Sequence, residues 1–268
     1  MKKKVMSLTI LVGLFLLFLV GGCSSNDSKV SGSEDGKGKM KLVNDGKLTF
    51  AMSGLLKPLN YKDNNKLVGF DVEIGEEISK RIGLESNPVT NPWETIIQGL
   101  KGKKYDAIIG SMTATEERSK QVDFSDPYYI SGAQVFVSAS NNAIKKKEDL
   151  KDKKIGVMQA STYQQDAAKY TKAIKNYPSD IYALQDLEPG RVDAVITDKI
   201  VGISAMKEAN LKIKDVDNVL KNENIAIAVN KDNPALLKAI NKAIKSMVED
   251  GTYEKISKKW FGVNLLEK

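Results

Sequence analysis

Apolar residues along this 268-residue chain follow two patterns that alternate over most of its length. Short, largely apolar runs occur at residues 48–52, 107–109, 154–158 and 194–197. Such runs are typical of buried strands in parallel sheets. Between them, apolar residues spaced three or four positions apart predict amphipathic helices. The alternation of short strands with helices predicts an α/β fold with largely parallel sheets.

Three helices and two extended strands are predicted most clearly. Apolar residues recur every four positions from Phe70 to Ile82, and the next residue, Gly83, ends this helix. A second apolar stripe runs from Trp93 to Leu100, and a third helix covers residues 233–250. The alternating segment 133–138 and the later segment 224–229 predict two strands that cross between parts of the molecule.

The amino-terminal residues resemble neither pattern. Lysines at positions 2–4 precede an apolar run at 11–20, which ends in Gly21-Gly22-Cys23. A positive segment followed by a short apolar core predicts an export signal over residues 1–22. An uncleaved membrane anchor is the alternative, but the apolar core is short for a full span. Residues 23–45 are rich in Ser, Gly, Asp and Lys, which predicts a disordered tether.

Composition narrows the function classes. The chain has one cysteine and no histidine, which excludes an intrachain disulfide and any histidine-based triad or metal site. The net charge is +7, but the lysines at positions 2–4 supply three of these charges and leave +4 for the rest. The remaining lysines are scattered and form no basic stripe with aromatic residues, so we expect no nucleic-acid partner.

A polar cluster follows the strand predicted at 107–109. Ser111, Thr113 and Thr115 occupy alternate positions, and Thr115 with the acidic residues after it predicts a helix start that includes Arg118. In open α/β sheets, ligands bind where strands end and helices begin. Arginine, hydroxyls and free backbone N–H groups together suit a carboxylate. On residue types alone, an ordinary loop with a solvated arginine is the simpler interpretation.

Three blocks of the sequence, taken in order, point further. GSMTATEERSKQVDFSDPYY, residues 110–129, resembles the signature of the polar amino-acid-binding proteins of bacterial ABC importers, solute-binding protein family 3. LVGFDVEIGEEISKRIG upstream and GRVDAVITD downstream resemble further blocks of that family. The resemblance covers residues 46–262, and three ordered blocks are more specific than any single motif.

The resemblance implies a two-lobed, periplasmic-binding-protein-like α/β fold of type II. Each lobe would hold a mostly parallel sheet flanked by helices, and two crossing strands would form the hinge. Lobe 1 would comprise residues 46–132 and 228–268, and lobe 2 residues 133–227. Residues 1–22 are similar to a lipoprotein signal peptide with its lipobox, which implies that Cys23 is lipidated at the start of the tether 23–45.

The resemblance also implies a ligand site. Arg118 would take the α-carboxylate and Asp198 the α-ammonium of one free L-amino acid. Asp198 could also cap the helix that follows it, and Trp93 could be a core residue. Leu56 stands where the family often has an aromatic residue, which leaves the identity of the amino acid open. The remaining positions implied to bind the ligand are Ser53, Met112, Ser111, Thr113, Ser161 and Thr162.

The implied function is capture of a free amino acid between two closing lobes and its delivery to the permease subunits of an ABC importer. The protein would be a monomer without a cofactor, lipid-anchored to the outer face of the cell membrane, and not an enzyme. An enzyme on the same fold, such as a dehydratase, would need a pocket carboxylate, for which Glu116 and Glu117 are the nearest candidates. A ligand-sensing module is the other alternative, but the lipid tether favours the importer component.

Overall fold

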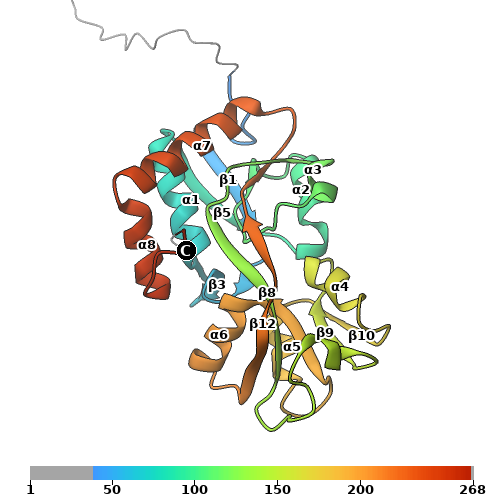
Figure 1. The fold of residues 1–268 in the computed structure, drawn as a ribbon. Helices are drawn as coiled ribbons and strands as arrows, with labels where there is room; N and C mark the ends of the chain where they lie inside the picture. Colours follow the sequence, from blue (N-terminus) through green and yellow to red (C-terminus); the bar gives the residue numbers. More distant parts are fainter. Residues whose placement is uncertain (1–38, 267–268) are drawn as a thin grey trace, which may run out of the picture. The chain divides into compact units, whose positions relative to one another are not determined.

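Two five-stranded sheets, one in each lobe, form the framework of residues 39–266, the part of the chain that the computed structural model describes (Figure 1). Sheet 1 has the strand order β5 (Glu85–Thr90), β1 (Lys47–Met52), β6 (Ala107–Ile108), β13 (Ala228–Val229) and β7 (Asp123–Phe124). Sheet 2 has the order β10 (Ile174–Tyr177), β9 (Ile155–Met158), β11 (Ala194–Asp198), β8 (Tyr129–Ser138) and β12 (Ile213–Ile225).

Four strands in each sheet run in the same direction, and one is reversed. The reversed strands are β13 in sheet 1 and β8 in sheet 2, each antiparallel to both of its neighbours. The other pairings along β1, β5, β6 and along β9, β10, β11 are parallel. The predicted fold class, an α/β protein with two lobes built on mostly parallel sheets, is therefore confirmed.

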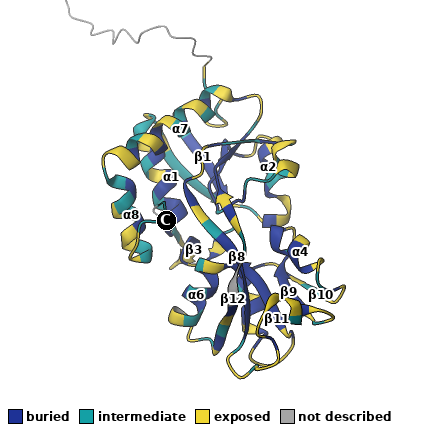
Figure 2. Ribbon diagram, viewed as in Figure 1, coloured by how far each residue is buried: buried dark blue, intermediate teal, exposed yellow. Residues whose placement is uncertain are grey.

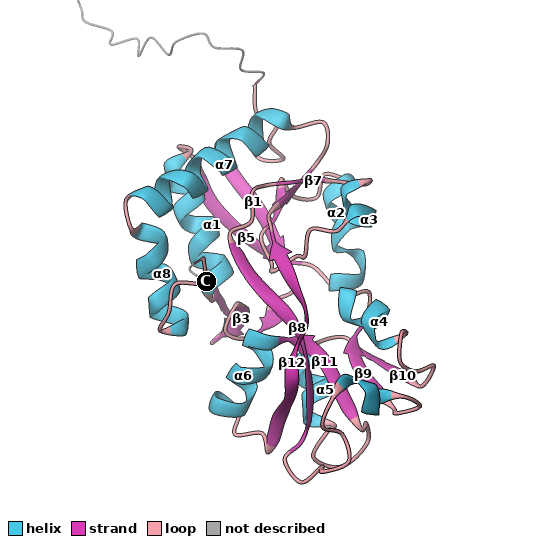
Figure 3. Ribbon diagram, viewed as in Figure 1, coloured by secondary structure: helices cyan, strands magenta, loops and turns pink. Residues whose placement is uncertain are grey.

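Helices cover both faces of each sheet (Figure 3). Lobe 1 contains α1 (Phe70–Arg81), the 3-10 turn η1 (Trp93–Thr95), α2 (Ile96–Lys101), α3 (Glu116–Ser119), α7 (Pro234–Glu249) and α8 (Thr252–Phe261). Lobe 2 contains η2 (Lys147–Leu150), α4 (Thr162–Ala167), α5 (Asp180–Gln185) and α6 (Lys199–Glu208). A small antiparallel sheet of β2 (Leu55–Leu56), β3 (Asn60–Asp63) and β4 (Lys66–Val68) lies between β1 and α1 in the sequence.

Alternation along the strands sends neighbouring side chains into different cores. In β1, Phe50 and Met52 pack with residues of α1, α7 and α8, whereas Ala51 packs with Trp93 and residues of α2. Successive side chains of a strand point to opposite faces of the sheet. The central strands β1, β9 and β11 are therefore buried on both faces, as the dark-blue residues of Figure 2 show. This double burial explains why the sequence shows continuous apolar runs there.

Most elements predicted from periodicity are present. The helices expected from Phe70 and over 233–250 correspond to α1 and α7, and Gly251 ends α7 with a φ of 77°. The strands expected at 48–52, 107–109, 154–158 and 194–197 correspond to β1, β6, β9 and β11, with ends within a residue of the prediction.

The two crossing strands differ from the prediction in their extent. β8 begins four residues before 133, and its first residue, Tyr129, packs in the lobe 1 core. The single strand predicted at 224–229 is wrong, because the chain there is divided between β12 and β13. The two residues between them bond to loops instead: Ala226 N donates to Met112 O at 3.0 Å, and Ile227 N donates to the Ser125 hydroxyl at 2.9 Å.

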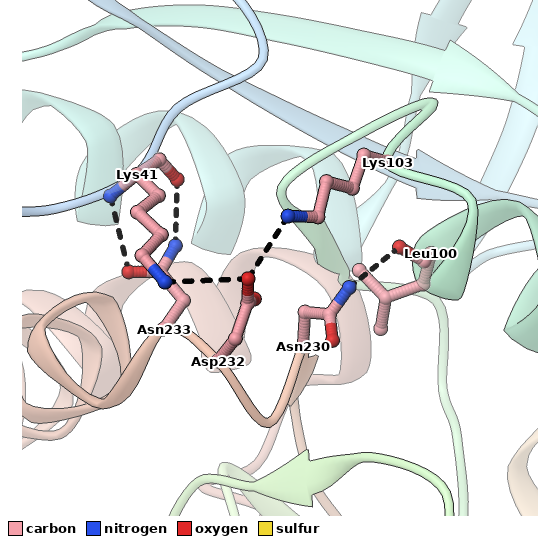
Figure 4. Close-up of polar contacts among 6 residues, drawn as sticks. All are labelled: Lys41, Leu100, Lys103, Asn230, Asp232 and Asn233. Atoms are coloured by element: carbon pink, nitrogen blue, oxygen red, sulfur yellow. Dashed lines mark hydrogen bonds and ion pairs between the residues drawn. The ribbon is translucent and has the colours of Figure 1, made fainter.

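The amino-terminal end of the described chain is held on lobe 1 (Figure 4). The Lys41 backbone donates to Asn233 Oδ1 at 3.2 Å and accepts from Asn233 Nδ2 at 2.7 Å. The ammonium groups of Lys41 and Lys103 both approach Asp232 Oδ2, at 3.3 and 2.9 Å. The predicted signal at 1–22 and Cys23 lie outside the described residues, as does most of the tether predicted at 23–45. Its last residues, 39–45, are described and lie against lobe 1.

Packing in lobe 2 gives a stability prediction at Gly202 in α6. A Cβ at this position would overlap the ring of Phe136, a fully buried residue of β8. Alanine favours a helix by up to about 1 kcal/mol over glycine. Here the overlap should dominate, so Gly202→Ala should lower the free energy of unfolding by about 1–3 kcal/mol. Urea unfolding measures this change. Lys207→Ala, at an exposed position of the same helix, is the control, and a Gly202→Ala variant as stable as wild type would contradict the prediction.

Candidate ligand site

A small cavity of about 20 Å³, room for about one water molecule, lies between the two lobes. Both lobes contribute to its wall. Its lining residues from lobe 1 are Ser53, Leu56, Leu59, Trp93, Gly110, Ser111, Thr113 and Arg118, and those from lobe 2 are Met158, Ser161, Thr162, Tyr163, Asp180 and Asp198.

The structure brings nine of the ten predicted ligand-binding residues to this one cavity. The exception is Met112, whose fully buried side chain packs in the core cluster that contains Trp93 and Ile108. Ser111 and Thr113, its neighbours on either side, do line the cavity. Met112 thus packs into the core, while its two neighbours line the cavity.

Arg118 lies where α3 meets the cavity. Thr115 caps α3 as the sequence predicts, since its hydroxyl accepts from Arg118 N at 3.2 Å. The guanidinium donates to Thr113 O at 2.9 Å and to Ala160 O of lobe 2 at 3.3 Å, and it lies over the Trp93 ring, 5.6 Å from its centre. Burial lowers the pKa of Arg118, while the nearby carboxylate of Glu223 raises it. Arginine stays protonated in proteins, so Arg118 is a partly buried cation.

A buried carboxylate fixes the position of Ser111. Asp71 Oδ2 accepts from the Ser111 hydroxyl at 2.7 Å and from Asn60 Nδ2 at 2.6 Å, and its Oδ1 accepts from the Tyr128 hydroxyl at 2.7 Å. The Tyr128 hydroxyl in turn accepts from Ser111 N at 3.0 Å. Ser111 has a φ of 60°, a conformation that costs a non-glycine residue energy and needs such support. Burial raises the pKa of Asp71 to about 6.

A second buried network lies behind Thr113, at the crossing strand β12. The Thr113 hydroxyl donates to Glu223 Oε2 at 3.1 Å. Lys221 Nζ lies 3.1 Å from Glu223 Oε1 and 2.9 Å from Asp166 Oδ2 of α4. The side chains of Glu223 and Asp166 are almost fully buried, and the ammonium of Lys221 balances part of their charge. The network joins the Arg118 loop to the hinge and to α4.

Asp198, at the end of β11, caps α6 and also faces the cavity. Its Oδ1 accepts from Ile200 N at 2.7 Å and from Val201 N at 3.3 Å. Burial raises the pKa of Asp198 to about 7. The capping role that the sequence left open is therefore present, and the same residue lines the cavity. Ser161 is the residue before α4, but its hydroxyl donates to Met158 O at 2.6 Å and does not cap the helix.

Sequence reasoning missed five lining residues: Leu59, Gly110, Met158, Tyr163 and Asp180. Asp180 is the most informative, because it is a second carboxylate. It follows β10 in the way that Asp198 ends β11, and the carboxyl ends of parallel strands meet at one edge of a sheet. β10 reads Ile-Lys-Asn-Tyr and lacks the apolar run that identifies the other strands. The similarity between the ends of β10 and β11 could therefore not be recognised from the sequence.

Several contacts close the cavity from its rim. Trp93 Nε1 donates to Ala160 O at 3.3 Å, the same carbonyl that accepts from Arg118. Gln165 Nε2 of α4 donates to Glu117 Oε2 at 3.1 Å, and the Ser179 hydroxyl donates to Leu55 O at 3.2 Å. The lobes thus touch on more than one side of the cavity, and the structure represents a closed arrangement.

Residues 39–266 include no group of side chains suited to hold a metal ion. In the same stretch of chain, every helix is too short or too polar to span a bilayer. The polar chemistry of the cavity therefore comes from its hydroxyls, one guanidinium and two carboxylates.

The fold and the enclosed cavity define a two-lobed binding protein. The sequence model of the bacterial extracellular solute-binding proteins, family 3, matches residues 48–263, and the chain belongs to this family. It is 32% identical over 259 residues to the L-cystine-binding protein TcyJ of Escherichia coli strain K12, covering 95% of this chain and 96% of the relative.

Solved structures agree with the family. An ancestral arginine-binding protein bound to arginine is 42% identical, with a TM-score of 0.77, and the match covers 81% of this chain and 99% of that one. The ancestral amino acid-binding protein AncCDT-1, a precursor of cyclohexadienyl dehydratase, is 34% identical, with a TM-score of 0.75 and coverage of 81% and 95%.

The raised pKa of Asp198 gives a pH prediction. Between about pH 4 and pH 7, the unfolded chain carries this group ionised while the folded chain keeps the proton. The folded state then binds more protons, so ligand-free stability falls as pH rises through this range. Asp198→Asn cannot ionise, so its melting temperature relative to wild type should increase by a few degrees from pH 4.5 to pH 7.5.

Thermal unfolding of protein stripped of ligand measures this difference. Asp186→Asn is the control, because the hydrogen bond from Lys175 holds the pKa of Asp186 below its usual range. Asp186 is thus ionised in both states above about pH 5, and its variant should differ from wild type by a constant amount there. A constant difference for Asp198→Asn as well would contradict the prediction.

Proposed function

We propose that this protein is an extracytoplasmic, monomeric binding protein that captures one free L-amino acid and delivers it to the permease subunits of an ABC importer. The observation that carries the proposal is the placing of Arg118 and Asp198 on opposite lobes around one enclosed cavity. A cation on one wall and an anion on the other complement the two charges of a zwitterion. Relatives named for binding cystine and arginine support this class of ligand.

Ligand binding would favour the closed arrangement by joining the lobes. The α-carboxylate would receive hydrogen bonds from Arg118 and from donors near Thr113, while the α-ammonium would donate to Asp198 in lobe 2. Charge-assisted hydrogen bonds are worth about 1.5–3 kcal/mol each. An amino acid bonded to both lobes would therefore shift the equilibrium between open and closed states strongly toward the closed one.

The ligand would leave chemically unchanged. Glu116 and Glu117, the candidate acids of the enzyme alternative, are not among the residues that line the cavity, and the Glu116 side chain is 93% exposed. AncCDT-1, a precursor of cyclohexadienyl dehydratase, is the reason to keep the enzyme alternative testable. Mass spectrometry of the ligand recovered after incubation tests this part, and a chemically altered ligand would favour the enzyme alternative.

The site itself is tested by two substitutions. Arg118→Ala or Asp198→Asn leaves one charge of the ligand unpaired in a closed cavity, a loss of about 2–5 kcal/mol. Affinity for the amino acid that binds wild type should therefore fall by about tenfold or more in each variant, as measured by calorimetry. Arg191→Ala is the control, since Arg191 is a largely exposed arginine of lobe 2 that pairs with Asp186. Unchanged affinity in both site variants would refute the proposed site.

The location is part of the proposal. Cys23 would carry a lipid that holds the protein on the outer face of the cell membrane, with the lipobox-like Gly21-Gly22-Cys23 as its basis. Cys23→Ala should then release the protein into the medium or leave it unprocessed, whereas Ser24→Ala should leave fractionation unchanged. Membrane fractionation with gel mobility distinguishes these outcomes, and a Cys23→Ala variant that behaves like wild type would exclude lipid anchoring.

A further inference from the structure

The charges that line the cavity do not balance for a simple zwitterion. The charged side chains in its wall are Arg118, Asp180 and Asp198. In the proposed function, the α-carboxylate of the ligand pairs with Arg118 and the α-ammonium pairs with Asp198. Asp180 then stays without an opposite charge inside a closed cavity, which is an unfavourable position for a carboxylate.

The surroundings of Asp180 supply a hydrogen bond but no cation. Asp180 is only 1% exposed, and its Oδ1 accepts from the Thr197 hydroxyl at 2.6 Å. Burial raises the pKa of Asp180 to about 6, so it is mostly ionised at neutral pH. Asp186, just past the other end of α5, has the opposite environment, with Lys175 and Arg191 at 2.7 and 2.9 Å. Asp186, just after α5, thus pairs with two cations, whereas Asp180, at the start of α5, pairs with none among the described residues.

Asp180 also lies in the right part of the cavity to meet a ligand side chain. It lines the same cavity as Asp198 of its own lobe and Leu56 of the other lobe. The preceding residue, Ser179, donates to Leu55 O across the lobes at 3.2 Å. A ligand that bonds to Asp198 in this cavity would therefore also meet Asp180.

We propose that Asp180 binds a second cationic nitrogen of the ligand, so that this protein prefers amino acids with two positive groups over neutral ones of the same size. The inference rests on the proposed function and adds a determinant of specificity to it. The second cation is either a side-chain guanidinium or ammonium, or the second α-ammonium of a double amino acid such as cystine. Both present the same chemistry to a carboxylate.

Arginine and citrulline provide the decisive comparison, because they have nearly the same shape and differ in the charge of the terminal group. Wild type should bind arginine at least about tenfold more tightly than citrulline. Asp180→Asn should bring the two affinities close together by weakening arginine binding, with little effect on citrulline. Glu188→Gln, which removes an exposed acid from the same lobe, should keep the wild-type preference. Calorimetry on the full mature chain measures all three proteins.

Cystine and S-methylcysteine form the second arm of the experiment. A preference for cystine that disappears in Asp180→Asn assigns the second cation to an α-ammonium, and a preference for arginine assigns it to a side chain. Equal binding of citrulline and arginine, together with equal binding of S-methylcysteine and cystine, by wild type would overturn the inference without any variant. So would a preference that persists in a folded Asp180→Asn protein.

The failure of this inference differs from the failure of the proposed function. Tight binding of a neutral amino acid that depends on Arg118 and Asp198 would keep the proposed function and remove the role of Asp180. The absence of binding to any amino acid would overturn both.

Discussion

The partly buried positive charge of Arg118 is the constraint on which the rest of the site depends. A guanidinium partly removed from water needs acceptors for its N–H groups, and the protein supplies them from two lobes, with Thr113 O on one side and Ala160 O on the other. The Trp93 ring covers one face of the same group. The arginine therefore links the lobes even before a ligand is considered. A ligand carboxylate would offer it a stronger, charged acceptor in the same place.

Two buried acids hold the residues next to this cation in position. Asp71 fixes Ser111 from the side of α1, and Glu223 holds Thr113 from the side of the hinge. Lys221 limits the negative charge that Glu223 brings close to the cavity. Without that ammonium, a carboxylate ligand of the proposed kind would approach an excess of like charge, so the hinge strand would influence binding through electrostatics.

The sequence predicted the fold better than the inner arrangement of the site. Doubly buried strands such as β1 and β9 leave continuous apolar runs, and the cap at Thr115 and the stop at Gly251 have clear local signatures. Arg118 and Asp198 could be located because they stand in blocks that resemble a family. Asp180 could not, since β10, the strand before it, is polar and only partly buried. The division of the predicted strand 224–229 depends on loop partners at Met112 and Ser125, which are distant in the sequence.

The docking of residues 39–43 on lobe 1 bears on which half of the molecule would move in the proposed anchored protein. These residues bond to Asn233 and Asp106, both in lobe 1, so an anchor at Cys23 would hold that lobe. Lobe 1 would then stay fixed near the membrane, and lobe 2 would move with each capture and release. A protein held in this way searches for its membrane partner in two dimensions instead of three.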